Sequence, residues 1–306
     1  MTFITNPYGK RLAMKFLLTW ALALTTLSAQ ALTIGAYNIR NFDYDERYRI
    51  LTNKPELANI IKQINADVLS VEEIHDTAKW DEFVATALPG YGTEVSRCGG
   101  DHGQRLGFLY NTKTVEMLSF NEDLSISNPG GPGTCDSGSR PLAIALFQIK
   151  ATKQRFFGMT AHLKSGNNGS GKREKQYQVI KNIINELKAK TGVKDFYFAG
   201  DLNTTEYSNK GSDYTQLTKV VRDLGMVNLT DRVGCTAYWW GGTDDGVENP
   251  TTLDHVIATP GLLKIQPQPL VYGHCAKVQC RQAKVKDLGI SYEGVSDHCP
   301  ITAKIQ

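Results

Sequence analysis

The side chains of this sequence that could do chemistry stand where hydrophobic runs end. In "FAGDLNTT", residues 198–205, an apolar run stops at Gly200, and Asp201 and Asn203 follow. Such runs predict β-strands, and the ends of neighbouring strands can converge at one edge of a sheet. Further polar residues stand at the ends of other runs: Asn38, Glu72, Glu73, His162, Asp254, His255, Asp297 and His298.

This set of residue types predicts a metal site with acid–base groups beside it. Carboxylate and amide oxygens are the ligands that hard divalent cations such as Mg²⁺, Mn²⁺ or Ca²⁺ prefer. A histidine held by an aspartate can transfer a proton. A divalent ion beside such a pair suits the hydrolysis of a phosphate ester.

The elements that must position these residues are predominantly strands. Three helices are predicted from apolar residues at i, i+3, i+4 and i+7 spacing, at 55–65, 172–190 and 213–224. Since many strands follow one another directly, we predict an α/β (α+β) fold with two packed mixed sheets and helices outside, not an alternating parallel barrel. The predicted strands are 32–39, 67–73, 105–111, 142–149, 155–163, 195–201, 252–258 and 301–305.

The first 31 residues have the pattern of a secretory signal. Basic residues precede an apolar stretch from Phe16 to Leu27, and Ala29 and Ala31 form an A-x-A cleavage site. The stretch is shorter than the roughly 20 residues that span a bilayer, which disfavours a membrane anchor. We expect cleavage after Ala31 and a secreted or periplasmic protein, with residues 1–13 as an upstream extension if translation starts at Met14.

Charge and cysteine content describe the remaining segment, 32–306, which suits one catalytic domain. The formal net charge of +3 comes from three basic residues in the leader, so the mature chain is neutral overall. A polyanionic substrate must therefore be held by local charge. The six cysteines all lie in this segment, and export favours disulfides of undetermined pairing. A zinc site is the alternative, although no C-x-x-C pair is present.

Six motifs in order resemble those of the deoxyribonuclease I-like endonuclease/exonuclease/phosphatase family. They are "YNIRNF", "DVLSVEEIHD", "HLKSG", "GDLNTT", "LDHVIAT" and "SDHCPITAKI", and they cover essentially the whole mature chain. The resemblance implies a four-layered α/β sandwich and a metal-dependent phosphodiesterase.

The resemblance also implies roles for individual residues. Glu73 and Asp297 correspond to metal ligands, and Asn38 lies near both metal and phosphate. Arg140 corresponds to a phosphate-contacting arginine.

The remaining matched positions concern the chemical step. Asp201 and Asn203 correspond to residues that orient the attacking water and contact the scissile phosphate. His298 corresponds to the catalytic histidine, Asp254 to the aspartate that holds it, and His162 to the second histidine of the deoxyribonuclease branch.

Three positions depart from the family pattern. Glu72 replaces the usual Gln, and its role is open. Gln104 replaces the Glu that pairs with the second histidine, so we expect an amide to hold His162 and this histidine to contribute less than His298. His255 stands where deoxyribonuclease I has an arginine, which leaves a substrate contact there open.

Two further segments have alternative interpretations. The loop with Lys164, Lys172, Arg173 and Lys175 lacks the Ser or Thr of a nucleotide-binding loop, and is expected to be mobile. Its positive charge could face phosphates or form a solvated surface. The segment "AYWWGG", 237–242, could stack on bases or belong to the core.

The sequence therefore predicts a secreted phosphodiesterase. We expect an endonuclease that uses Mg²⁺, with Mn²⁺ or Ca²⁺ as alternatives, and hydrolyses DNA, and RNA as a further substrate, to 5′-phosphate products. We expect a monomer without stable membrane association. The alternatives are a sphingomyelinase-like or small-molecule phosphodiesterase with the same site, and a non-catalytic binding protein of the same fold.

Overall fold

The computed structural model describes residues 32–47, 49–243 and 245–305. The predicted signal segment, 1–31, lies outside these described residues. The helices are α1 (Lys54–Ile64), α2 (Thr77–Ala87), α3 (Ser170–Thr191), α4 (Ser212–Asp223), α5 (Gly273–Val278), α6 (Val285–Leu288) and α7 (Ile290–Glu293). None of the helices in the described part is both long and apolar enough to cross a bilayer.

The strands are short and numerous. Their bounds are β1 (Thr33–Phe42), β2 (Tyr44–Asp45), β3 (Ile50–Leu51), β4 (Val68–Ile74), β5 (Tyr91–Val95), β6 (Arg105–Asn111), β7 (Val115–Asp123), β8 (Leu142–Ile149), β9 (Arg155–Thr160), β10 (Phe196–Asp201), β11 (Val227–Asn228), β12 (Ala237–Trp239), β13 (Val247–Thr251), β14 (Asp254–Ala258), β15 (Gln268–Val271), β16 (Ala283–Lys284) and β17 (Ile301–Lys304).

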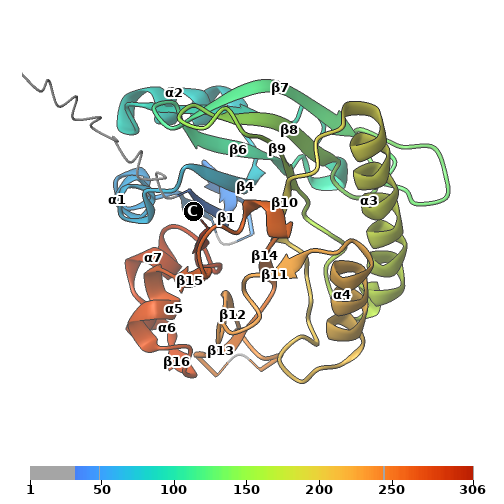
Figure 1. Ribbon diagram of the computed structural model, residues 1–306. Helices are drawn as coiled ribbons and strands as arrows, with labels where there is room; N and C mark the ends of the chain where they lie inside the picture. Colours follow the sequence, from blue (N-terminus) through green and yellow to red (C-terminus); the bar gives the residue numbers. More distant parts are fainter. Residues whose placement is uncertain (1–31, 48, 244, 306) are drawn as a thin grey trace, which may run out of the picture.

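Two mixed six-stranded sheets form the centre of the molecule. Their strand orders are β15-β17-β1-β4-β6-β5 and β11-β14-β10-β9-β8-β7. Phe108, Phe147 and Tyr197 belong to the apolar core between the sheets. Helices α1 and α2 pack on the outside of the first sheet, and α3 and α4 on the outside of the second (Figure 1). The predicted four-layered sandwich is confirmed.

Helix α1 illustrates how local sequence determines an element. The Asn53 side chain accepts a hydrogen bond from the backbone N–H of Glu56, and Pro55 stands in the first turn. The helix ends at Asn65, which adopts the left-handed conformation. Its apolar face, which includes Leu57 and Ile61, packs against the first sheet.

The eight predicted strands and three predicted helices are all present, with ends that differ by a few residues. Helix α2 was not predicted, although Trp80, Phe83 and Val84 follow helical spacing and are buried. Strand β7 was not predicted either, because it is an edge strand whose residues are mostly exposed or half-buried and it lacks a strong apolar run.

Three disulfides join all six cysteines, so the alternative of a zinc site is wrong. Cys98 pairs with Cys135, Cys235 with Cys280, and Cys275 with Cys299. Three disulfides are typical of an oxidising compartment outside the cytosol.

The expectation that Arg173 belongs to a mobile basic loop is wrong. Arg173 is fully buried, and its guanidinium forms a bidentate pair with Asp213 at 2.8 and 3.0 Å. It also donates to the carbonyl oxygens of Lys164 and Gly166. Arg173 therefore ties the loop before α3 to the start of α4.

We predict that Arg173→Ala lowers the free energy of unfolding by about 3–5 kcal/mol, because it leaves Asp213 buried without its cation. Urea denaturation measures the change. Lys175→Ala is the matched control, since Lys175 is exposed on the same helix. Equal stability of the two variants would contradict the structural role of Arg173.

Candidate active site

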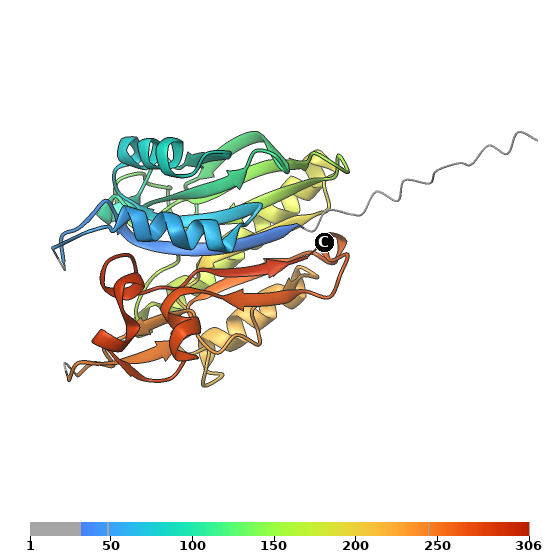
Figure 2. The same ribbon diagram turned by 90° about the vertical axis from the view of Figure 1, so that its left-hand side faces the viewer.

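The predicted site residues meet at one edge of the two sheets. Asn38 lies on β1, Glu73 near the end of β4, and Asp201 at the end of β10. Figure 2 shows this edge on the left, where the β2–β3 and β12–β13 segments protrude from the body of the molecule. The sheets belong to different layers, so the site is assembled across the interface between them.

The Asp201 carboxylate lies at the centre of these contacts. Its Oδ2 atom lies 3.2 Å from Asn38 Nδ2, 3.2 Å from His162 Nε2 and 3.7 Å from His298 Nε2. Its Oδ1 atom accepts a hydrogen bond from the backbone N–H of Asn203 at 2.9 Å. Residues from both sheets therefore converge on one buried carboxylate.

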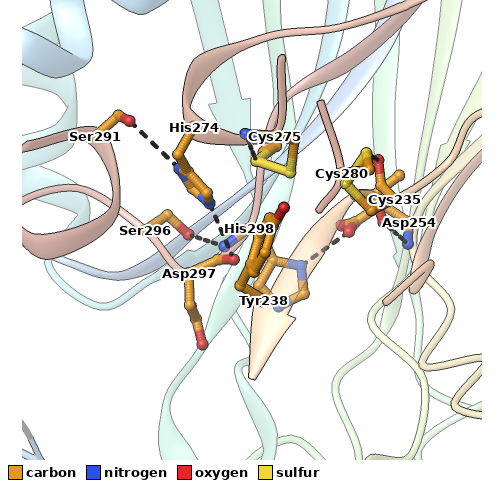
Figure 3. Close-up of a disulfide and its surroundings, with 12 residues drawn as sticks. Cys235, Tyr238, Asp254, His274, Cys275, Cys280, Ser291, Ser296, Asp297 and His298 are labelled. Carbon is orange, nitrogen blue, oxygen red and sulfur yellow. Dashed lines mark hydrogen bonds and ion pairs between the residues drawn. A yellow bond between two sulfur atoms is a disulfide. The ribbon is translucent and has the colours of Figure 1, made fainter. Parts of the chain in front are cut away.

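His298 is oriented from behind by Asp254. The distance from His298 Nδ1 to Asp254 Oδ2 is 2.9 Å (Figure 3). This contact leaves Nε2 facing Asp201 at 3.7 Å. The Asp254 backbone N–H donates to the hydroxyl of Thr236, and the His298 backbone N–H donates to the hydroxyl of Ser296. These contacts fix both members of the pair.

Glu73 lies beside Asn38 on the neighbouring strand. Its Oε1 accepts from Asn38 Nδ2 at 3.1 Å, and its Oε2 accepts from the backbone N–H of Asn41 at 3.1 Å. Asp297 is half-buried in the loop before β17, and its negative charge acts on Glu73. In Figure 3 the Asp297 and His298 side chains leave this loop in different directions.

Several residues around the site have a positive φ, a backbone conformation that residues other than glycine seldom adopt. Arg40, Asn41, Glu73 and Asn203 have φ between 46° and 62°. The β1–β4 register shifts between Asn38 and Phe42, and the β4–β6 register shifts at Glu73. Such bulges re-aim side chains, and strain of this kind concentrates at functional sites.

Glu72 points into the space between the sheets rather than toward the rim. It is fully buried, and its Oε1 accepts from the Thr160 hydroxyl at 2.7 Å. Burial raises its pKa well above the usual range, which favours a neutral carboxyl. A Cβ on Gly200 would lie 2.6 Å from this oxygen, so the residue before Asp201 must be glycine.

The expected support of His162 by Gln104 is wrong. Gln104 Nε2 donates to Asn41 Oδ1 at 2.6 Å, and its oxygen accepts from the Arg140 guanidinium. His162 Nδ1 instead lies 3.7 Å from Glu73 Oε1. Gln104 therefore positions Arg140, which is close enough to act electrostatically on Glu73.

His255 does not offer a substrate contact. The pleat of β14 turns Asp254 toward the site and His255 to the opposite face. There His255 is fully buried, with its ring nitrogens 2.7 and 3.2 Å from the hydroxyls of Thr204 and Thr230. Burial lowers its pKa to about 3, so it is a neutral core residue.

The two histidines at the site differ in charge. Burial, together with the charges of Arg140 and His298, holds the pKa of His162 well below its usual range. Burial also disfavours the charged form of His298, but the attraction of Asp254 and Asp201 outweighs it and raises its pKa. Burial raises the pKa of Asp201 to about 7, against the opposing effect of His298.

The collection of carboxyl groups fits a divalent cation. Burial and the charge of Asp297 both raise the pKa of Glu73, although Arg140 opposes this. A hard cation would relieve the repulsion and prefers these oxygen ligands. In addition, Asp201, Asp254 and His298 present ligand atoms that all lie within 4.8 Å of one another.

Sequence reasoning missed the residues that hold the site together. Ser296 donates to the backbone oxygen of Asn38 at 2.7 Å and so joins the loop of His298 to β1. Asn41 connects Glu73 to Gln104. A hydroxyl two residues before His298 is a common turn signal, but its long-range partner has no local signal.

Solved structures with this fold are numerous, whereas no curated protein matches the chain. An endonuclease/exonuclease/phosphatase from Bacteroides vulgatus is 20% identical, covers 90% of this chain and 98% of its own, and has a TM-score of 0.62. TDP2 from D. rerio, complexed with single-strand DNA product, is 18% identical with 90% and 98% coverage and a TM-score of 0.59. A mannosyl-6-phosphatase from Bacteroides thetaiotaomicron is 16% identical with 89% and 98% coverage and a TM-score of 0.59.

The model of the endonuclease/exonuclease/phosphatase family matches residues 35–298. This range contains every residue of the Asp201 cluster described above. The chain therefore belongs to the endonuclease/exonuclease/phosphatase family.

Proposed function

We propose that the protein is a secreted, divalent-metal-dependent phosphodiesterase that hydrolyses nucleic acid. The single observation that carries the proposal is the Asp201 Oδ2 atom, which Asn38, His162 and His298 approach within 3.7 Å while Asp254 holds His298 from behind. A binding protein of this fold would have no need to bury an acid–base pair beside two carboxylates. The signal predicted from the sequence of residues 1–31 and the three disulfides support export.

Glu73, Asp297 and Asn38 are the residues that would hold the cation, and Mg²⁺ is the ion that we propose. When bound, such an ion neutralises charge on the phosphate. The nearby Asp201–Asp254–His298 group is an alternative ligand set. We favour the first set because Asp254 already has a defined partner in His298.

The remaining residues would bind the phosphate and move the proton. Asp201 and Asn203 would orient the attacking water, with Asp201 Oδ2 as the proton acceptor, a role that its pKa of about 7 fits. His298, as the charged partner, would hold a proton at Nε2 toward the reacting phosphate. Arg140, Asn38 and neutral His162 would stabilise the developing negative charge.

The choice of nucleic acid as substrate rests on the resemblance and on relatives of the same fold. The similar D. rerio structure contains a single-strand DNA product, and the B. thetaiotaomicron structure is a mannosyl-6-phosphatase. Exposed Trp239 and Trp240 favour a lipid as a second candidate substrate. Assays with plasmid, single-stranded DNA, RNA, mannose 6-phosphate and sphingomyelin vesicles, with and without chelator, separate these substrate classes.

We predict that Asp201→Asn and His298→Ala each lower kcat on DNA by roughly 10²–10⁴-fold, the usual contribution of a positioned acid or base. His162→Ala should reduce kcat less, because no carboxylate of the described residues lies within hydrogen-bond distance of His162 Nδ1, whereas Asp254 holds Nδ1 of His298. Steady-state nicking measures the loss, and circular dichroism checks folding. The matched controls are exposed Asp136→Asn and His102→Ala. Near-normal turnover by folded Asp201→Asn would refute the mechanism.

We predict that Glu73→Gln weakens the binding of Mg²⁺ or Mn²⁺ by on the order of 10–100-fold, because it removes a charged ligand. Isothermal titration calorimetry without substrate measures binding independently of turnover. Glu94→Gln is the control, since Glu94 is exposed on β5. If Glu73→Gln binds the metal with unchanged affinity, the metal site is instead the Asp201–Asp254–His298 set.

A further inference from the structure

A cavity of about 470 Å³ adjoins the candidate active site. Trp239 and Trp240 line it from β12 and the turn that follows, and Arg47 lines it from the β2–β3 segment. Asp297, one of the proposed metal ligands, lines the same cavity. The cavity therefore begins beside Asp297 and extends between two segments that protrude from the same edge.

The two indole side chains are unusual in their exposure. Trp239 is 48% and Trp240 47% exposed, whereas Tyr238 beside them is 2% exposed. They form an adjacent pair among the exposed large hydrophobic residues, as do Tyr44 and Leu51, which are cross-strand partners on the β2–β3 segment. Two neighbouring indoles that solvent can reach, at the rim of a cavity, are typical of a surface that binds a ligand.

The position of this pair relative to the active site is fixed by covalent and hydrogen bonds. The Tyr238 N–H donates to the Asp297 carbonyl oxygen at 2.9 Å, and Ala237 forms a β-bridge with His298. The Tyr238 hydroxyl donates to the Arg281 carbonyl oxygen at 2.8 Å. The Cys235–Cys280 disulfide ties the start of this hairpin to the segment before β16 (Figure 3). The indoles are thus held at a defined distance from Asp297 and His298.

The two indoles give the cavity a flat aromatic surface. An indole face can stack on another planar ring, in an offset or edge-to-face arrangement. Glu248 and Asp297 make part of the lining acidic. These carboxylates repel the phosphates of an anionic lipid surface and of nucleic acid alike, so the two tryptophans, and not the charge of the cavity, favour a base.

We propose that Trp239 and Trp240 form a stacking platform for an unpaired nucleobase next to the scissile phosphate. This inference rests on the proposed function, because the base must belong to the strand that the site hydrolyses. A base inside a duplex offers no free face, so the platform would favour single-stranded nucleic acid or frayed ends. Stacking on aromatic side chains is tolerant of sequence, so little base preference is expected.

The test compares an oligothymidylate with an oligonucleotide of the same length in which abasic residues replace the thymidines. Binding is measured by fluorescence anisotropy with chelator present, so that turnover does not intervene. We expect the wild type to bind oligothymidylate more tightly. Trp239→Ala and Trp240→Ala should each weaken this binding roughly 5- to 150-fold, the equivalent of one lost base stack, and leave abasic binding unchanged. Trp240→Phe should bind oligothymidylate more tightly than Trp240→Ala, because phenylalanine can still stack on a base.

Leu118→Ala is the control, because Leu118 is an exposed apolar residue on β7, an edge strand of the second six-stranded sheet. If both tryptophan variants bind oligothymidylate like the wild type, the platform is refuted, although wild-type cleavage of DNA would still support the proposed function. If they lose binding to sphingomyelin vesicles but not to oligothymidylate, the surface is a lipid contact and the inference is also refuted. A wild type that neither binds nor cleaves nucleic acid refutes the proposed function itself.

Discussion

A carboxylate buried between two β-sheets must have polar partners, and the surroundings of Asp201 supply them from both sheets. Its Oδ2 atom faces Asn38 from the first sheet and His162 from the second. Its Oδ1 atom accepts a hydrogen bond from the backbone N–H of Asn203. An isolated carboxylate in this position would be costly, and nearby Glu73 and Asp254 add like charge. The residues around it are therefore best understood as groups that make a concentration of negative charge tolerable.

The same constraint explains the backbone of the site. Glu73 can reach Asn38 and Asn41 because a bulge turns it out of the regular pleat, while Glu72 points inward to Thr160. Gly200 leaves room for Glu72 where a Cβ would collide. The contact of Ser296 with Asn38 then anchors the loop that carries Asp297 and His298. The bulge at Glu73, the absence of a side chain at Gly200 and the Ser296–Asn38 hydrogen bond together bring polar groups close to the Asp201 carboxylate.

The sequence indicated much of the architecture because strands end in polar residues and helices have apolar faces. The ends of the runs at Glu73, Asp201 and Asp254 led directly to the edge where these residues meet. By contrast, Gln104 pairs with Arg140, and Arg173 is buried against Asp213. Both contacts join segments more than 30 residues apart, so no local pattern encodes them. The orientation of His255 could have been inferred, since it follows Asp254 in a strand and must face the other way.

In the proposed mechanism, water oriented at Asp201 attacks a phosphodiester while a divalent cation is bound. Cleavage of an oligonucleotide in ¹⁸O-labelled water, followed by mass spectrometry of the product ends, tests this directly. We expect 5′-phosphate ends that carry one ¹⁸O atom from solvent, and no product when a chelator removes the metal. Products with 3′-phosphate ends, or cleavage that persists in chelator, would contradict it.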